Sequence, residues 1–169
     1  MAENKMRKIE IEKIVLNIGT APDQSEVEKA VKLLSLISGK KAVKTVSDKR
    51  IAGWKIRPGL AIGAKVTVRG NKATLVLIKR LLDAKEFRIK RKSFTRGGFS
   101  FGIEEYIDIE DVEYEPSVGL KGLDVCVSLK RSGFRVKHKL KGTRIGKSHI
   151  INAEDAANFA VKELGVELI

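Results

Sequence analysis

The stretch RKIEIEKIVLNIG, residues 7–19, contains the pattern that decides the fold. Apolar and polar residues alternate along it, which is typical of a β-strand with one buried face. The parity of the apolar residues changes between Ile11 and Ile14. Because an inserted residue in a strand has this effect, we predict one long strand with a bulge or bend at Lys13–Ile14.

A helix is expected directly after this strand. Pro22 and Asp23 open it, and Glu26 stands three residues beyond Asp23, as in a capping box. Gly39 is placed to end the helix. Its buried face is predicted from the helical spacing of Val27, Ala30, Val31, Leu34 and Ile37.

The rest of the chain alternates between strand and helix patterns. Strands are predicted at 42–46, 61–70, 124–130 and 134–140, and in RGGFSFGI (96–103) after a glycine-rich turn. The strand at 61–70 carries Ala64, Val66 and Val68 on one face. A second helix is capped by Asn71 and buries Leu75, Ile78 and Leu82, and a last helix runs from Asn152 to Gly165. These elements predict an α+β fold, a single antiparallel-rich sheet with helices packed on one face and the other face free for a ligand.

Length and composition set further limits. The chain has 169 residues, of which 43% are hydrophobic, enough for the core of a single domain spanning 1–169. The apolar runs are too short to span a bilayer, and no signal peptide is recognisable at the start, so we expect a soluble, intracellular protein. One cysteine, Cys126, excludes an internal disulfide and a multi-cysteine zinc site.

The formal charge of +13 is distributed unevenly. Segments 40–57, 85–96 and 130–147 together hold 21 basic residues and only two acidic ones. Segment 104–115 holds seven acidic residues and no basic one. A charge run can be a merely solvated face, but three runs that contain the whole excess favour a polyanionic partner, with nucleic acid as the default. We expect the acidic segment to face a basic protein, because its carboxylates would repel phosphate.

The patterns that suggest an enzyme fail on inspection. GTRIGKS (142–148) resembles a phosphate-binding P-loop, but the first glycine is needed at position 141, which is Lys141. His138 and His149, the two histidines, lie in a strongly basic part of the chain, and His138 is expected to be a packed structural residue. Cys126 is expected to be a small buried residue. We therefore predict no catalytic site, no metal and no cofactor.

Features typical of RNA binding are stronger. RGGFSF (96–101) fails the RNA-recognition strand pattern, because its third position is Gly98 instead of an aromatic residue. Residues 47–59 are predicted to form an extended, exposed basic loop. A lone tryptophan is commonly a core residue, but Gly53, Lys55 and the nearby Pro58–Gly59 favour exposure of Trp54. An exposed ring could stack on a base or sugar while cations hold phosphates.

Five stretches in sequence order resemble the large-subunit ribosomal protein L five (L5) family. They are KIVLNIG (13–19), SGKKAV (38–43), AGWKIRPGLAIGAKVTVRG (52–70), RGGFSFGI (96–103) and GLDVCVSLKRSG (122–133). The likeness runs from about Met6 to the C-terminal helix. The chain looks like an archaeal-type member, because it carries a longer basic insert, residues 131–149, before the last helix.

The resemblance implies a structural, cytoplasmic role in the central protuberance of the large ribosomal subunit. The partners it implies are 5S rRNA, 23S rRNA, P-site tRNA, ribosomal protein L eighteen and, across the subunit interface, ribosomal protein S thirteen. No membrane partner is expected. Two other classes are kept as alternatives: a freestanding RNA-binding chaperone or translation regulator, and an RNA-modifying enzyme, which would need a catalytic constellation.

Three sets of site residues are predicted from the resemblance and the basic segments together, with Asn17, Lys40, Thr67, Arg69 and the loop residues placed by the family's motifs. For 5S rRNA binding they are Lys13, Asn17, Lys40, Lys41, Lys44, Thr67 and Arg69. For the tRNA-facing loop they are Lys49, Arg50, Trp54, Lys55 and Arg57. For other rRNA contacts they are Arg88, Lys90, Arg91, Lys92, Arg96, Arg135, Lys137 and Lys139. A glutamine common in bacterial members is replaced by Lys40, which favours a phosphate contact there over base-edge recognition.

Overall fold

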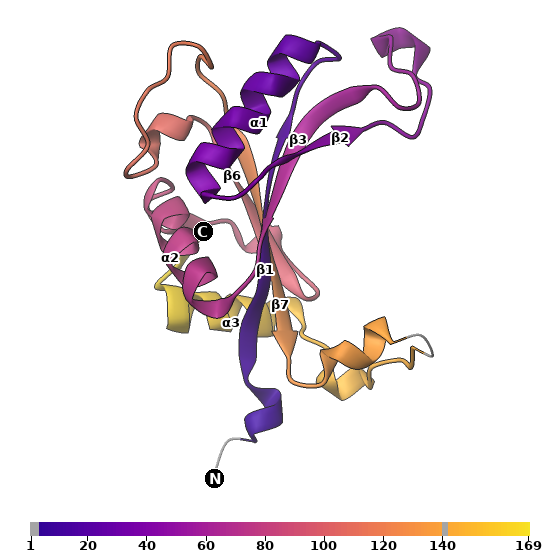
Figure 1. Ribbon diagram of the computed structural model, residues 1–169. Helices are drawn as coiled ribbons and strands as arrows, with labels where there is room; N and C mark the ends of the chain where they lie inside the picture. The colour runs from indigo at the N-terminus through magenta and orange to yellow at the C-terminus, as the bar shows by residue number, and fades with distance from the viewer. Residues whose placement is uncertain (1–3, 140–141) are drawn as a thin grey trace. The chain divides into compact units, whose positions relative to one another are not determined.

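The computed structural model describes residues 4–139 and 142–169 (Figure 1). The chain divides into two compact units, each assembled from segments that are distant in sequence. Unit 1 contains the described residues of 1–14, 69–101 and 127–169, and unit 2 contains 15–68 and 102–126.

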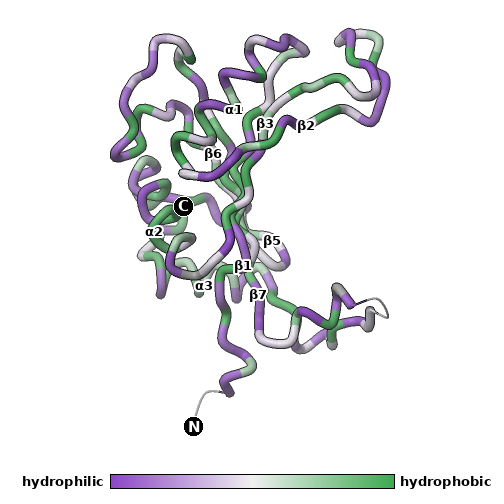
Figure 2. Tube along the Cα trace, viewed as in Figure 1, coloured by the Kyte–Doolittle hydropathy of each residue, from purple (hydrophilic) through white to green (hydrophobic). Residues whose placement is uncertain are grey.

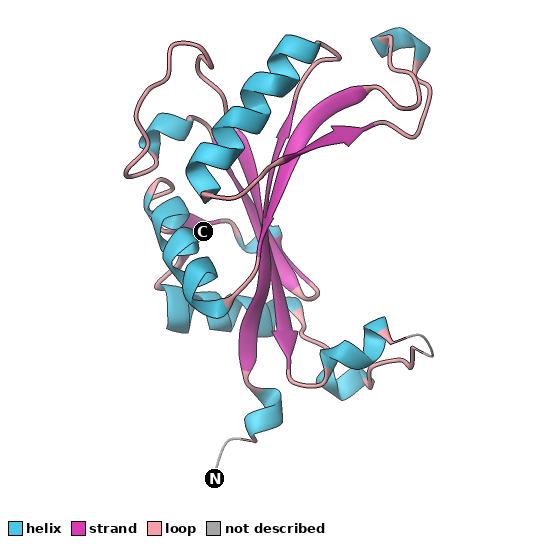
Figure 3. Ribbon diagram, in the orientation of Figure 1, coloured by secondary structure: helices cyan, strands magenta, loops and turns pink. Residues whose placement is uncertain are grey.

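Three α-helices and two sheets form the described chain (Figure 3). The larger sheet has six strands in the order β2-β3-β1-β7-β6-β5, and β2/β3 and β5/β6 pair antiparallel. The smaller sheet pairs β4 with β8 in parallel. The fold is therefore α+β with an antiparallel-rich sheet, as predicted. The strands are β1 (Ile9–Gly19), β2 (Val43–Val46), β3 (Ala61–Val68), β4 (Arg88–Ile89), β5 (Phe94–Thr95), β6 (Gly98–Ile103), β7 (Leu123–Arg131) and β8 (Glu167–Leu168). The helices are α1 (Gln24–Ser38), α2 (Asn71–Asp83) and α3 (Ala153–Leu164).

Strand β1 has the predicted change of phase. Ile11 is buried on one parity, and Ile14, Leu16 and Ile18 are buried on the other, so the buried face shifts within one continuous strand. The alternation is visible as changing colour along the strands in Figure 2.

In unit 2, α1 packs on β3. The Asp23 side chain caps the helix by accepting from the Ser25 backbone N–H (3.0 Å), and Gly39 ends it with a left-handed φ of 61°. Two details of the prediction are wrong. Val31, which was predicted to be buried, is half-buried, and Leu33 is buried instead. Instead of completing the predicted capping box, the Glu26 carboxylate pairs with the ammonium groups of Lys29 and Lys121, because both lie within its reach.

In unit 1, α3 begins after Asn152 and ends at Gly165, whose φ is 71°, as predicted, and a capping box between Asn152 and Asp155 holds its start. Helix α2 differs from expectation at its start, because its N-cap is Gly70, with a φ of 108°, and Asn71 is its first residue. Its buried face is also rotated: Thr74 and Leu81 are fully buried, whereas Leu75 is 38% exposed.

The predicted strand at 134–140 is wrong. A turn at Ser132–Gly133, with Gly133 in a left-handed conformation (φ 91°), redirects the chain after β7. Phe134–His138 then forms a 3₁₀-helix, and position 140 of the predicted strand lies outside the described residues. The alternation of this segment therefore does not reflect a pleated strand. None of the helices in the described parts of the chain is long and apolar enough to cross a membrane.

Candidate nucleic-acid interface

The sheet of unit 2 has a polar face opposite its buried one. Along β3, Ala64, Val66 and Val68 are buried, whereas Lys65 is exposed and Thr67 is half-buried. Asn17 is half-buried on β1, the neighbour of β3, between the buried Leu16 and Ile18. Because successive side chains of a strand point to opposite faces, Lys65, Thr67 and Asn17 emerge away from the core. We call these three residues the open-face cluster.

The lysines after α1 lie differently. Lys40 and Lys41 are exposed directly after Gly39. Lys44 pairs in register with Ala64, so it lies on the helix side of β2, and its Nζ contacts Glu28 Oε1 at 3.2 Å. A hydrogen bond from Gln24, and then the one from Lys44, lowers the pKa of Glu28 below its usual value. The structure therefore separates Lys44 from the open-face cluster.

Two more of the predicted 5S-binding residues belong to unit 1. Lys13 is half-buried on β1, and Arg69 is exposed directly after the end of β3.

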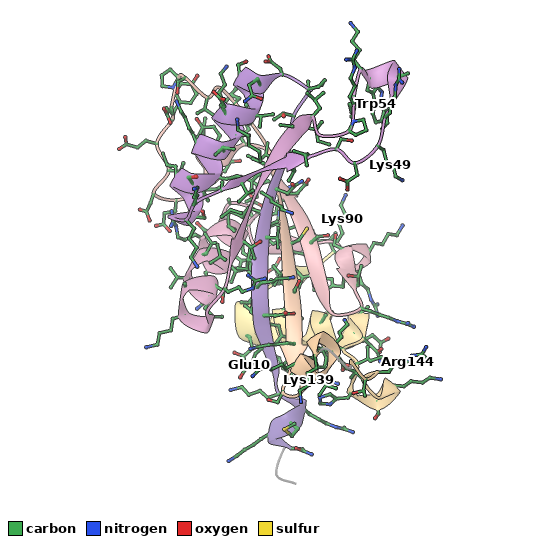
Figure 4. The ribbon with its side chains drawn as sticks, turned by 45° about the vertical axis from the view of Figure 1, so that its right-hand side comes forward. Glu10, Lys49, Trp54, Lys90, Lys139 and Arg144 are labelled. Carbon is green, nitrogen blue, oxygen red and sulfur yellow. The ribbon has the colours of Figure 1, made fainter. Side chains whose placement is uncertain are left out.

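The loop 47–59 is exposed, as predicted, but its backbone folds into a hydrogen-bonded turn instead of an extended conformation. Ile51 and Ile56 exchange two backbone hydrogen bonds (3.0 and 3.1 Å), and Ala52–Trp54 between them forms a 3₁₀ turn. Lys55 closes this turn with a φ of 54°, a left-handed conformation that few side chains adopt. Trp54 is 69% exposed, which confirms its predicted exposure, and Figure 4 shows Lys49 and Trp54 on this loop.

The cations of this loop are candidates for contact with an external anion. Among the described residues no ion pair holds Lys49, Arg50, Lys55 or Arg57. Their charges are thus available to an external anion.

In segment 85–96 the cations divide into paired and unpaired groups. Arg88 contacts Glu86 (2.9 Å) and Glu167 (3.9 Å), although exposed pairs of this kind stabilise little. Lys90, Arg91 and Lys92 are exposed in and beside the 3₁₀-helix Arg91–Ser93. Arg96 lies in the turn between β5 and β6.

The insert 131–149 is held by a buried cation. Arg131, 8% exposed, pairs with Asp155 (3.1 Å) and donates to the carbonyl oxygens of His149 and Ile150, both at 3.3 Å. Residues 140 and 141 of the insert lie outside the described residues. Arg135, Lys137 and Lys139 are exposed, and Lys137 lines a pocket together with Arg96. Figure 4 labels Lys139 and Arg144 on the insert.

The predicted site residues omit three cations that the structure brings forward. Lys65 belongs to the open-face cluster and could have been found from its parity with Thr67. Arg144 and Lys147 line the pocket beside Arg96, and their only local signal is the P-loop-like pattern.

The acidic segment 104–115 is anchored by its apolar residues. Tyr106, Ile109 and Val112 are buried at a spacing of three, and the Tyr106 hydroxyl accepts from the Glu115 backbone N–H (3.0 Å). Six of the seven carboxylates are exposed and that of Glu115 is half-buried. The segment therefore presents an ordered negative edge.

The position of Cys126 differs from the prediction. It is exposed, because its neighbours Val125 and Val127 occupy the buried face of β7. Partial burial of the thiol, followed by the Asp124 carboxylate, raises the pKa of Cys126 and disfavours the nucleophilic thiolate. Within the described residues, no three histidine, cysteine or acidic side chains form a group that could hold a metal ion.

Comparison with known proteins identifies the family. The family profile described as "Ribosomal protein L5" matches residues 4–57, and the profile for the C-terminus of the same ribosomal family matches residues 61–161. The "Large ribosomal subunit protein uL5" of Nanoarchaeum equitans is 47% identical over 99% of both chains. The protein of the same name from Cenarchaeum symbiosum is 43% identical over 97% of this chain and 98% of the relative. The one from Dictyostelium discoideum is 40% identical over 93% of this chain and 78% of the relative.

Two family profiles that together span most of the chain, and relatives matched over nearly their whole length, agree with the five motifs of the sequence. The chain therefore belongs to the ribosomal protein L5 family and is a structural ribosomal protein, not an enzyme.

Proposed function

We propose that the chain binds 5S rRNA and 23S rRNA in the central protuberance, contacts P-site tRNA through loop 47–59 and bridges to the small-subunit head. It does so as a structural constituent of the large ribosomal subunit, the role that goes with its family. In this proposal the chain, 1–169, acts as one RNA-binding domain.

The open-face cluster carries the proposal for 5S rRNA. Its amide, hydroxyl and ammonium groups are presented by paired strands, so their spacing is fixed before RNA arrives. An ammonium group holds phosphate, while Asn17 and Thr67 can exchange hydrogen bonds with 2′-hydroxyls and base edges. Lys44 is peripheral in this arrangement, because it faces α1 and contacts Glu28.

Two lysines on opposite faces of the same strand pair provide the test. Lys65→Gln and Lys44→Gln remove the same charge, at Lys65 from the open face and at Lys44 from the helix side. In gel-shift titrations with 5S rRNA, the change at Lys65 should weaken binding several-fold more than the change at Lys44. Equal losses would refute the assignment to the open face.

Salt dependence tests whether the binding is electrostatic. If about 6–10 phosphates are contacted, affinity for 5S rRNA should fall roughly 10³–10⁵-fold between 50 and 200 mM salt. Binding that ignores salt, or no binding to 5S rRNA, would refute the proposal.

The proposed tRNA contact rests on loop 47–59. Cations for which the described residues provide no ion pair stand close in sequence to the exposed indole of Trp54, a combination suited to phosphate contact and stacking. The backbone bridge Ile51–Ile56 holds these groups in one arrangement.

The acidic segment 104–115 is the feature that favours a protein partner over RNA. Its exposed carboxylates would repel RNA, so we assign this edge to a basic protein surface, ribosomal protein S thirteen at the small-subunit head. Ribosomal protein L eighteen is proposed as a neighbour without a contact surface assigned to it. Crosslinks from this segment to rRNA alone would count against that assignment.

A freestanding chaperone or translation regulator is the competing hypothesis. Sedimentation through high-salt sucrose gradients distinguishes the two, because a core ribosomal protein remains with the large subunit and a freestanding protein is released.

A further inference from the structure

We propose that a pocket of unit 1, formed by the insert and the turn at Arg96–Gly97, accepts an unstacked nucleobase whose flanking phosphates meet a cationic rim. The strand that carries this base is single-stranded or bulged RNA. The inference rests on the proposed binding of rRNA and adds a base-binding site on the insert to it.

The pocket is large enough for this ligand and has an apolar lining. Its volume is about 570 Å³, within the ~300–1,000 Å³ typical of small-molecule sites. Phe134, Ile145, Ile150 and Ile151 supply apolar surface. The planar face of a base favours such surroundings, and an aromatic ring such as Phe134 is a common stacking partner.

The charged residues that line the pocket, which we call its rim, are all cationic. Arg96, Lys137, Arg144 and Lys147 line it, and no carboxylate is among the lining residues. Within the described part of the chain, none of these four cations is held in an ion pair. A phosphate on either side of an inserted base would therefore meet an uncompensated positive charge.

The charges argue against an apolar protein side chain as the occupant. An apolar side chain gains from the apolar lining but leaves four cations without an anion, whereas a base within a strand, with a phosphate on each side, satisfies both the apolar lining and the cations around it. A base inside a duplex is stacked and cannot enter, so the RNA must offer it unpaired.

The walls are held in place without RNA. Arg131 fixes the carbonyl groups of His149 and Ile150, and His149 Nε2 donates to the Ser132 carbonyl oxygen at 2.8 Å. The His149 ring also packs against Phe134 at a centroid distance of 5.6 Å and an angle of 73°. These contacts pre-form the pocket, which reduces the ordering cost of binding.

The same walls include most of the P-loop-like segment. Gly142, Thr143, Arg144, Ile145 and Lys147 line the pocket. The segment ends in the three-residue 3₁₀-helix Lys147–His149, and α3 begins later, at Ala153. The segment therefore presents side chains to a ligand without the helix that a P-loop requires.

A short oligouridylate with one central 2-aminopurine is the probe, used with the full-length protein. Three matched probes accompany it: the same strand with a central abasic site, its duplex with the complement, and free ATP. We expect the single strand to bind at least about fivefold more tightly than the abasic strand, because one stacked base contributes roughly that much. We expect the duplex to bind more weakly than the single strand and ATP not to compete.

Two aspartate variants separate the pocket from the general charge. Ile145→Asp places a carboxylate in the pocket, and Ile107→Asp makes the same change at a 39% exposed position of the acidic segment. Only Ile145→Asp should abolish the preference for the base-containing strand. Photocrosslinking of a 4-thiouridine strand to the unmodified protein provides a measurement that needs no variant, with the crosslink expected within 134–151.

The proposal is overturned if the abasic strand or the duplex binds as tightly as the base-containing strand, or if the crosslink maps elsewhere. Competition by ATP would assign the pocket to a free nucleotide, and binding of an acidic peptide with no binding of the strand would assign it to a protein; both overturn it. Loss of 5S rRNA binding while the base preference remains would refute the proposed function alone.

Discussion

Replacing Arg131 by methionine tests how the insert is held to the rest of unit 1. The side chain is 9% exposed, and its guanidinium contacts Asp155 and two backbone carbonyl groups. Methionine keeps most of the apolar stem, so the change removes mainly the polar contacts. Without the guanidinium, the carbonyl groups of His149 and Ile150 lose the donor that Arg131 provides.

The expected loss follows from three contributions of different sign. The carbonyl groups of His149 and Ile150 lose their donor, at about 1–3 kcal/mol for each group that stays unsatisfied, and at the low end because both residues are half-buried. The Asp155 side chain is 39% exposed, so loss of the ion pair adds at most ~1 kcal/mol. Arg131 Nε is buried without a partner, and its removal returns about 1 kcal/mol. The net loss of unfolding free energy is therefore about 2 kcal/mol.

Urea unfolding followed by far-ultraviolet circular dichroism measures this loss. Fluorescence of Trp54 is unsuitable, because its ring is 69% exposed in the folded protein. Arg135→Met is the matched control, since Arg135 is exposed in the same insert and should cost less than ~0.5 kcal/mol. If the two variants lose the same free energy, Arg131 does not anchor the insert.

Three further changes test other parts of the molecule. A Cβ at Gly63 would lie 2.4 Å from the Ile18 carbonyl oxygen, so Gly63→Ala should cost about 1–3 kcal/mol in urea unfolding, whereas Gly53→Ala, with open space around it, should cost little. The hydrogen bond from Lys121, and then that from Lys29, lowers the pKa of Glu26 below 4.5, so its stabilising contribution is present above the unfolded pKa and lost as pH falls through the folded one. The gap in melting temperature between the unmodified protein and Glu26→Gln should therefore close in acid; a gap that persists below both pKa values would contradict this. Replacing Arg50, Lys55 and Arg57 by glutamine removes three positive charges from loop 47–59. This change should weaken retention of P-site tRNA by ribosomes and spare 5S rRNA binding in gel shifts. Equal loss of both would place the loop in the 5S site.

Local patterns predicted most of the fold because they depend on neighbouring residues. The phase change in β1, the Asp23 cap and the Gly39 and Gly165 helix ends each involve residues within one element, and each is confirmed. The prediction of a buried Cys126 is wrong. Val125 and Val127 are buried on one face of β7, and their alternation directs the Cys126 side chain to the opposite face, although cysteine is commonly a buried residue type.

The insert could not be predicted in this way. Its anchor, Arg131, lies 18, 19 and 24 residues from its three partners, and no period along the chain reports such contacts. The alternation in 134–140 imitates a strand, but the turn at Gly133 determines the outcome. The separation of Lys44 from Lys65 likewise depends on the register of β2 with β3, which the sequence does not contain explicitly.

Pairing of charges explains more about this protein than their number. A net charge of +13 predicts a polyanionic partner but does not say which cations bind it. Arg131 and Lys121 are held by carboxylates and support the fold. The cations of loop 47–59 and of the pocket rim have no such partner among the described residues, yet a backbone bridge holds the loop and the side chains of Arg131 and His149 hold the insert. The cations that lack a partner among the described residues suit the proposed RNA partners, and the exposed carboxylates of segment 104–115 suit the proposed basic protein partners.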